Sequence, residues 1–186
     1  MMVSDLNAFV AIDVETANSD CGSICQIGVV SVDQGEIVDE WQTLVDPGTP
    51  FADRNIKIHG ITAWDVESAQ TFSGIYDDVL VKLAGQVVAC HTMFDRRALR
   101  AACDIYRLED VDCLWLDTAH VARHSWPQFR QRGYTLDNIA KHLGIKFLHH
   151  NALEDAHAVA LVLLRAIEET GLTVRQWQDG QTPDQK

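Results

Sequence analysis

The sequence predicts an α/β domain with a mixed β-sheet, because two kinds of hydrophobic pattern follow one another along the chain. Three apolar runs come first, and Asp33-Gln34-Gly35 supplies a tight hairpin between the second and the third, so these two are expected to pair antiparallel. From Phe72 onward, apolar residues at helical spacing alternate with short apolar runs. Together the two patterns indicate a five-stranded mixed sheet with helices on both faces.

The individual elements follow from these patterns and from cap and turn residues. Strands are expected at residues 9–16, 24–32, 37–45, 87–90 and 113–116. Helices are expected at residues 72–83, 94–105, 117–123, 135–142 and 151–169, with a loop over 125–133. Thr135 is a candidate helix cap, and Asn151 with Glu154 resembles a capping box. In the segment 56–62, Gly60 indicates a tight turn, and a short helix is expected from Ala63.

Length and composition are those of one soluble globular domain. The 186 residues can bury a substantial core, and we expect a single domain over residues 1–175 and a polar, frayed tail over 176–186. The N-terminus lacks the pattern of a secretory signal, and no apolar run approaches the ~20 residues that span a bilayer. Five cysteines without a CxxC pair favour free thiols in a reducing compartment, so a cytoplasmic location is expected.

The net charge restricts the ways in which the protein could bind nucleic acid. A formal charge of −12 argues against a protein that coats nucleic acid through a basic surface. It does not exclude an enzyme that holds one end of a strand, because bound metal ions reverse the charge locally.

The first candidate site is the acidic pair at the end of the first apolar strand. Asp13 and Glu15 alternate with apolar residues, so both side chains point to one face, with Cα atoms about 7 Å apart. Two carboxylates this close repel each other, and a hard divalent cation would relieve that repulsion. The pattern alone is weak, since acid-x-acid also occurs at 65–67 and 110–112, where a solvated surface is the simpler interpretation.

Two further acidic positions lie where other elements meet. Asp95 follows the strand 87–90 at the start of a helix, and Asp155 lies in the first turn of the last helix, close to His150. Taken singly, Asp95 could be a helix cap, Asp155 could complement a helix dipole, and His150 could be exposed like His149. Taken together, four acids and one histidine meet the needs of two-metal phosphodiester hydrolysis, in which histidine accepts the proton of the attacking water.

Three motifs in this order resemble those of the DEDDh 3′→5′ exonucleases, over most of the chain from about Phe9 to Leu164. The motifs are Asp13-x-Glu15-Thr16, Phe94-Asp95, and His150-x-Ala152-x-x-Asp155. This family includes the proofreading subunit of bacterial replicative DNA polymerase, ribonuclease T and oligoribonuclease. The resemblance implies a ribonuclease-H-like fold and two divalent cations, Mg²⁺ or Mn²⁺. It also assigns four metal ligands and one general base, which are Asp13, Glu15, Asp95 and Asp155, and His150.

The same resemblance implies a set of substrate contacts, namely Thr16, His59, His91 and Phe94. His91 departs from the family pattern, in which asparagine usually stands four residues before the aspartate of the second motif. From the residues alone, His59-Gly60 is equally compatible with a structural turn. Arginines at 96, 97, 100, 123, 130 and 132 lie near or between the motifs, where solvated helix faces and phosphate contacts are both open interpretations.

The sequence therefore predicts a metal-dependent 3′→5′ exonuclease that releases nucleoside monophosphates from single-stranded 3′ ends, with DNA favoured. One alternative is the same chemistry on RNA or short oligoribonucleotides. Another is a binding module that keeps the fold without turnover. The expected partners are nucleic-acid 3′ ends, and the resemblance adds a polymerase or another repair protein; a homodimer stays open.

Overall fold

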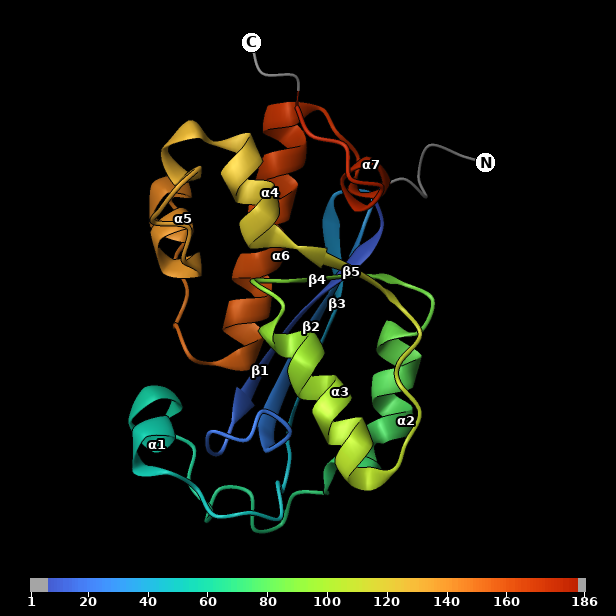
Figure 1. Ribbon diagram of the computed structural model, residues 1–186, viewed down its shortest axis with the longest axis vertical. Coiled ribbons are helices and arrows are strands. Elements are labelled where there is room, and N and C mark those ends of the chain that lie inside the picture. The colour runs from blue at the N-terminus through green and yellow to red at the C-terminus, as the bar shows by residue number, and fades with distance from the viewer. Residues whose placement is uncertain (1–6, 184–186) are drawn as a thin grey trace.

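The computed structural model describes residues 7–183, and the predicted domain start at residue 1 and the last tail residues, 184–186, lie outside this range. Its centre is a sheet with the strand order β3-β2-β1-β4-β5 (Figure 1). The strands are β1 (Phe9–Thr16), β2 (Ile24–Asp33), β3 (Glu36–Leu44), β4 (Val87–Cys90) and β5 (Leu114–Asp117). β1 and β3 pair antiparallel with β2, while β4 pairs parallel with both β1 and β5. The predicted mixed sheet is confirmed.

The hairpin between β2 and β3 has the predicted turn chemistry. Gln34 and Gly35 both have positive φ, at 52° and 83°, and two such residues form the tight turn whose twist matches that of the flanking strands. Asp33 and Glu36 are the last paired residues, so the antiparallel register is fixed from this end.

Helices cover both faces of the sheet (Figure 1). They are α1 (Asp53–His59), α2 (Phe72–Leu83), α3 (Phe94–Tyr106), α4 (Thr118–Ser125), the 3₁₀ helix η2 (Pro127–Phe129), α5 (Leu136–Leu143), α6 (Ala152–Thr170) and α7 (Val174–Gln178). One core forms between the sheet and α4 to α7, and the other forms between the sheet and α2 and α3. Because Phe9 and Ala11 of β1 face the first core, the alternating side chains Asp13 and Glu15 continue along the α6 face.

One prediction for the segment between β3 and α2 was wrong. The tight turn expected at Gly60 is present, since Gly60 has a φ of 78° where the helix α1 ends, but residues 63–68 form turns in place of the short helix expected from Ala63. The backbone hydrogen bonds in this stretch join residues three apart in the sequence, for example from Asp65 N–H to the Thr62 carbonyl. Only Val66 of this stretch is buried, so tertiary packing gives a helix little support.

Several other elements differ from the predictions at their ends. The fifth strand begins one residue later than predicted, and the Thr135 side chain bonds Asp137 in place of the helix backbone. The frayed tail was predicted wrongly for residues 176–178, because α7 extends to Gln178 and Trp177 is 3% exposed in the core beside α6. Within residues 7–183, none of the helices has the length and hydrophobicity needed to cross a bilayer.

Candidate active site

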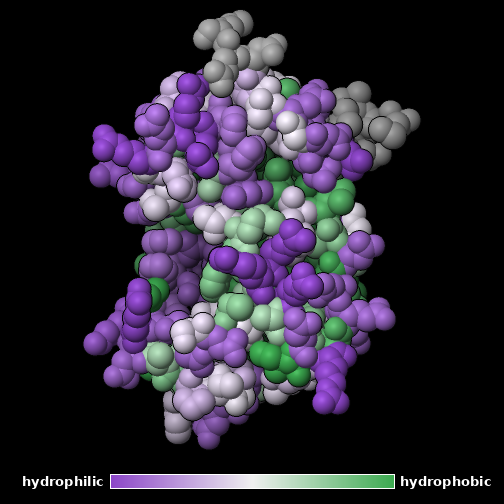
Figure 2. Space-filling view, in the orientation of Figure 1, coloured by the Kyte–Doolittle hydropathy of each residue, from purple (hydrophilic) through white to green (hydrophobic). Residues whose placement is uncertain are grey.

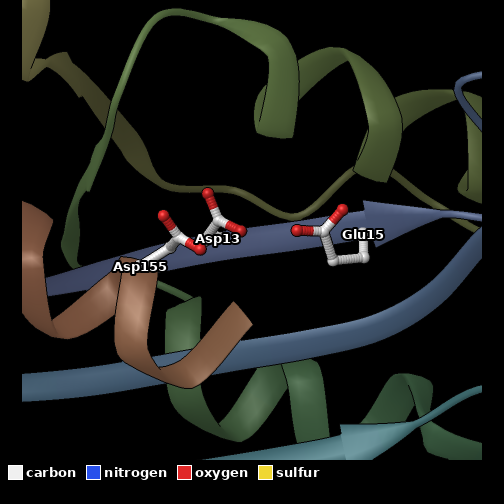
Figure 3. A group of neighbouring side chains, drawn as sticks. All are labelled: Asp13, Glu15 and Asp155. Atoms are coloured by element: carbon white, nitrogen blue, oxygen red, sulfur yellow. The ribbon is translucent and has the colours of Figure 1, made fainter. Parts of the chain in front are cut away.

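Three carboxylates converge where β1 ends and α6 begins. One oxygen of each of Asp13, Glu15 and Asp155 can be chosen so that all three lie within 4.8 Å of one another. Figure 3 shows Asp13 and Glu15 along β1, with Asp155 reaching them from the first turn of α6. The strand alternation therefore brings the two β1 acids to the place where a third carboxylate arrives from a distant part of the chain.

The close approach of α6 to the sheet depends on a glycine. Gly28 of β2 is the register partner of Asp13, and a Cβ atom at Gly28 would overlap the backbone of Ala152 at the start of α6. The same contact is fixed by the buried Gln26 side chain, whose Oε1 accepts a hydrogen bond from Ala152 N–H at 3.0 Å. β2 thus sets the position from which Asp155 reaches β1.

Asp95 lies behind the cluster and is 2% exposed in the first turn of α3. Its Oδ1 accepts a hydrogen bond from Val14 N–H at 3.0 Å, so the side chain joins α3 to β1 between Asp13 and Glu15. The helix-cap alternative does not describe this contact, since the bond is made to a neighbouring strand. Asp95 is outside the three-residue cluster but contributes to its charge.

The carboxylates make one another difficult to ionise. Burial, followed by the charges of Asp95, Asp155 and Glu15, raises the pKa of Asp13 well above its ordinary value. Burial and then Asp155 and Asp95 raise the pKa of Glu15 from 4.5 to about 7. Burial also raises the pKa of Asp95. Such a group of oxygen ligands, short of positive charge, fits a hard divalent cation.

Two neighbouring histidines cover the acidic cluster, and their rings stack with centroids 3.9 Å apart. His150 Nδ1 lies 3.8 Å from Glu15 Oε1, while its backbone N–H donates to Asp155 Oδ2 at 2.6 Å. His149 Nδ1 contacts Asp155 Oδ1 at 2.6 Å. Burial and then the neighbouring His149 lower the pKa of His150, which favours its neutral form. His150 has a left-handed backbone, with φ of 68°, and the two rings approach different carboxylates.

The cluster faces a cavity of about 420 Å³ that holds most of the predicted site residues. Its lining includes the predicted contacts Thr16, His59, His91 and Phe94, together with Asp13, Glu15, His150 and Asp155. Other lining residues were not predicted as site residues, and these are Val14, Asn55, Ile58, Thr92, Tyr134, Thr135, Leu136, Asp137 and His149. In Figure 2 a hydrophilic hollow opens between the regions that Figure 1 labels α5 and α1.

His59 has the structural contacts of a turn and also lines the cavity. Its Nδ1 accepts from Ile61 N–H at 3.0 Å, so the neutral ring donates through Nε2 to the Thr16 carbonyl at 3.2 Å. Asn55 Nδ2 donates to the same carbonyl at 2.8 Å. α1 is therefore fastened to the end of β1, which supports the structural interpretation of His59, and its contact with a substrate stays a prediction.

His91 connects two walls of the cavity. Its Nε2 donates to the Tyr134 carbonyl at 2.8 Å, and its Nδ1 lies 3.1 Å from Thr118 Oγ1. Burial lowers the pKa of the ring, so the neutral form is favoured. With both nitrogens bonded to the protein, His91 holds the loop before α5 against the end of β4.

Comparison with known proteins identifies the family. A family model described as Exonuclease (RNase_T) matches residues 10–163. The chain belongs to this exonuclease family. DNA polymerase III PolC-type of Thermotoga petrophila is 33% identical over 164 residues, which cover 86% of this chain and 12% of that protein. The relative from Caldanaerobacter subterraneus is 30% identical over 87% of this chain and 12% of its own length. The chain thus spans about an eighth of these polymerases.

Solved exonuclease structures have the same fold. Exonuclease X, in complex with 5′ overhanging duplex DNA, has 26% identity and a TM-score of 0.77 over 92% of this chain and 98% of its own. The nuclease domain of 3′hExo, a DEDDh family member bound to rAMP, has 22% identity and a TM-score of 0.71 over 88% of this chain and 92% of its own. The predicted family and the ribonuclease-H-like mixed sheet are confirmed.

The unpredicted lining residues of this exonuclease come mostly from two segments without a chemical signal in the sequence. Asn55 and Ile58 belong to α1, which has no buried residue and therefore no apolar period. The segment 134–137 joins the predicted loop 125–133 to the predicted helix 135–142, and its place at the cavity follows from the His91 contact. His149 is exposed, as predicted, and its contact with Asp155, six residues later, was not predicted.

Proposed function

We propose that this exonuclease domain is a metal-dependent 3′→5′ enzyme that releases nucleoside monophosphates from single-stranded ends, with DNA favoured over RNA. The observation that carries the proposal is the convergence of Asp13, Glu15 and Asp155 beside the buried Asp95, with His150 at the edge of the same cavity. Few other functions require four carboxylates to be held together against their mutual repulsion.

The residues suited to hold two divalent cations, Mg²⁺ or Mn²⁺, are Asp13, Glu15, Asp95 and Asp155. Their raised pKa values fit this role, since a cation compensates the charge that the fold concentrates there. When bound, such ions polarise the phosphodiester and stabilise the charge of the attacking and leaving oxygens. Asp13 and Asp155 lie together at the cavity, and Asp95 supports β1 through Val14.

His150 is proposed as the general base. Its ring is partly exposed to the cavity, and its lowered pKa keeps it unprotonated near neutral pH, so that it can accept the proton of an attacking water. His149 is assigned a supporting position, because its Nδ1 is engaged with Asp155. Thr16 and Phe94, with the half-exposed Ile58, supply a surface for the terminal nucleotide.

The DNA preference and the polymerase connection are supported by the relatives. The PolC-type proteins are DNA polymerases, and the Exonuclease X structure contains DNA. We propose that the domain acts with a replicative polymerase or another repair protein, either as a segment of that protein or as a separate chain. This proposal concerns only the portion that the domain represents, about 12% of the relatives' length.

Degradation of end-labelled substrates tests the function directly. Single-stranded DNA, RNA and duplex DNA carrying a 5′ label are incubated with Mg²⁺ or Mn²⁺, and the ladder and the released nucleotides are analysed. Progressive shortening with release of nucleoside 5′-monophosphates, fastest on single-stranded DNA, is expected. Faster loss of RNA would favour the exoribonuclease alternative. Absence of turnover on all three substrates would leave a binding module.

A further inference from the structure

One segment of this acidic protein is strongly basic. Residues 119–148, here called the α4–α5 segment, carry five Arg and Lys residues and one acid, Asp137. The chain as a whole has a formal charge of −12, so the segment at +4 leaves −16 on the remainder. The basic residues are Arg123, Arg130, Arg132, Lys141 and Lys146.

These cationic side chains are exposed and available to a ligand. Among the described residues, the Lys and Arg side chains that form ion pairs lie elsewhere, at Lys82, Arg100, Arg165 and Arg175. In the α4–α5 segment, Arg123 donates to the Arg130 carbonyl at 3.1 Å and places its guanidinium 5.0 Å from the centre of the Tyr134 ring. The segment thus presents positive charge without acidic partners in the described part of the chain.

The α4–α5 segment contributes one wall of the active-site cavity, and its five basic residues lie beyond that lining. Tyr134 to Asp137 line the same cavity as Asp13 and Asp155. In Figure 1, α5 lies across from α1, and Figure 2 shows the hollow between these regions. The opposite wall, α1, carries Arg54 and Lys57 against Asp53, a smaller excess of positive charge. A strand that leaves the cavity on the α5 side therefore meets the more favourable potential.

A second hollow lies in the same segment, and its lining residues Gly133 and Asn138 flank the cavity-lining stretch 134–137 in the sequence. It has a volume of about 370 Å³, and Arg132, Asn138 and His142 contribute to its lining. The exposed His142 ring packs edge-on against Phe129, with centroids 5.4 Å apart, and it lines the same hollow as Arg132. Stacking surfaces next to cations are the usual elements of single-strand binding.

We propose that the α4–α5 segment is the track for the nucleotides upstream of the scissile bond, with Arg130 and Arg132 contacting phosphates of a single strand. The proposal rests on the proposed function, because the cavity must first receive the 3′ end. It explains how a protein of net charge −12 retains a polyanion: the contacts are concentrated along one exit from the active site.

The test is a charge reversal that spares the active site. Arg130→Glu with Arg132→Glu removes two proposed contacts at exposed side chains. The matched control, Arg107→Glu with Arg175→Glu, makes the same change in net charge at the far end of α3 and in α7. Both are compared with wild type on 5′-labelled oligothymidylate of about 16 nucleotides and on thymidine 5′-(4-nitrophenyl) phosphate, which lacks upstream nucleotides.

If the α4–α5 segment is this track, the double variant should lose activity on the long substrate and keep it on the short one. For Arg130→Glu/Arg132→Glu, kcat/KM on the oligomer should fall about tenfold or more at low salt, mainly through KM, and the salt slope should become shallower by about 1.4, for two contacts on a single strand. Activity on the nitrophenyl ester should stay within about twofold of wild type. The control should retain both activities.

Fluorescence anisotropy of the labelled oligomer in EDTA separates this proposal from the proposed function, because it measures binding without turnover. The first double variant should bind about tenfold more weakly than the control. An equal loss in the two variants would attribute the effect to net charge and overturn the track, as would unchanged binding by Arg130→Glu/Arg132→Glu. If wild type binds through the segment yet cleaves neither substrate, the segment remains the binding surface for a single strand and the exonuclease proposal alone fails.

Discussion

At the scale of the residue, Asp13 is the position on which the surrounding charge converges, since Asp95, Asp155 and Glu15 all raise its pKa in addition to burial. Asp13→Ala is predicted to reduce turnover by at least about 10³-fold while the protein stays folded, because it removes a ligand of the proposed metal site. Rates are measured at saturating Mn²⁺ on single-stranded DNA. Glu67→Ala, at an exposed acid-x-acid pair, is the control and should keep the wild-type rate.

Glu15 makes stability depend on pH in a defined direction. Its pKa is raised from 4.5 to about 7, so between these values the folded protein binds a proton that the unfolded chain has lost. The metal-free protein should therefore lose stability as the pH rises through this window, by an amount on the order of 1–3 kcal/mol. In EDTA, Glu15→Gln should melt above wild type at pH 8, and the difference should close below pH 4.5. An equal difference at pH 5 and pH 8 would contradict this origin.

The two stacked histidines provide a comparison within one loop. His150→Ala should lower the rate by roughly 10²–10⁴-fold, the usual contribution of a positioned base. Because burial lowers the pKa of His150, the wild-type rate should fall on the acid side only below its ordinary value of 6.5. His149→Ala loses a contact with Asp155 and should keep a rate much nearer wild type at saturating Mn²⁺. If His149→Ala is the more impaired variant, the role of base belongs to His149.

The acidic residues were predictable from the sequence because local rules position them. Asp13 and Glu15 share a face through strand alternation, and Asp95 and Asp155 each lie in the first turn of a helix. Which histidine meets which carboxylate was not predictable, because it depends on the path of the loop before α6, where His150 has a positive φ. The cavity wall at Tyr134 was not predictable either, because it is held by a hydrogen bond to His91, which lies 43 residues away in the sequence.

At the scale of the element, the position of α6 against β2 decides whether the site exists. Gly28→Ala places a methyl group into the backbone of Ala152, so α6 must shift and take Asp155 with it. The variant should lose about 1–3 kcal/mol of stability. It should also bind Mn²⁺ more weakly, which is measured by the gain in melting temperature with the ion.

The control for this substitution is Gly74→Ala in α2. Its added Cβ would lie 3.1 Å from Cβ of the exposed Gln70, so the chain there must shift by a few tenths of an ångström, and alanine favours the helix. Wild-type activity and Mn²⁺ response are expected there. Undiminished Mn²⁺ binding in folded Gly28→Ala would show that the carboxylates can be brought together without this close approach.

The elements differ in how far the sequence determines them. β1, α2 and β4 have the predicted bounds, because a buried strand and a helix with four buried residues leave clear periods. α1 has seven residues and none buried, so its formation depends on bonds to Thr16 that no local pattern reveals. α7 was not predicted for a related reason: its two buried residues, Val174 and Trp177, are too few to reveal a helical pattern in a polar sequence.

At the scale of the whole molecule, charge and the shape of the cleft together predict a requirement for a free 3′ end. Most of the surface repels a polyanion, because −16 of formal charge lies outside the α4–α5 segment. An internal phosphodiester would have to enter the cavity with strand continuing on both sides, and only one of them runs along the strongly basic α4–α5 segment. A terminal nucleotide needs only one exit. Circular single-stranded DNA should therefore resist the enzyme, whereas its linear form is shortened.

The comparison uses one sequence in three forms: circular, linear with a 3′ hydroxyl, and linear with a 3′ phosphate. The 3′-phosphorylated strand should be cut slowly, because it brings additional negative charge beside Asp13, Glu15 and Asp155. Products are separated by length at saturating Mn²⁺, and Asp13→Ala is run in parallel to exclude a contaminating nuclease. Cleavage of the circle at a rate near that of the linear strand would mean that both exits accept nucleic acid, and the domain would then act as an endonuclease.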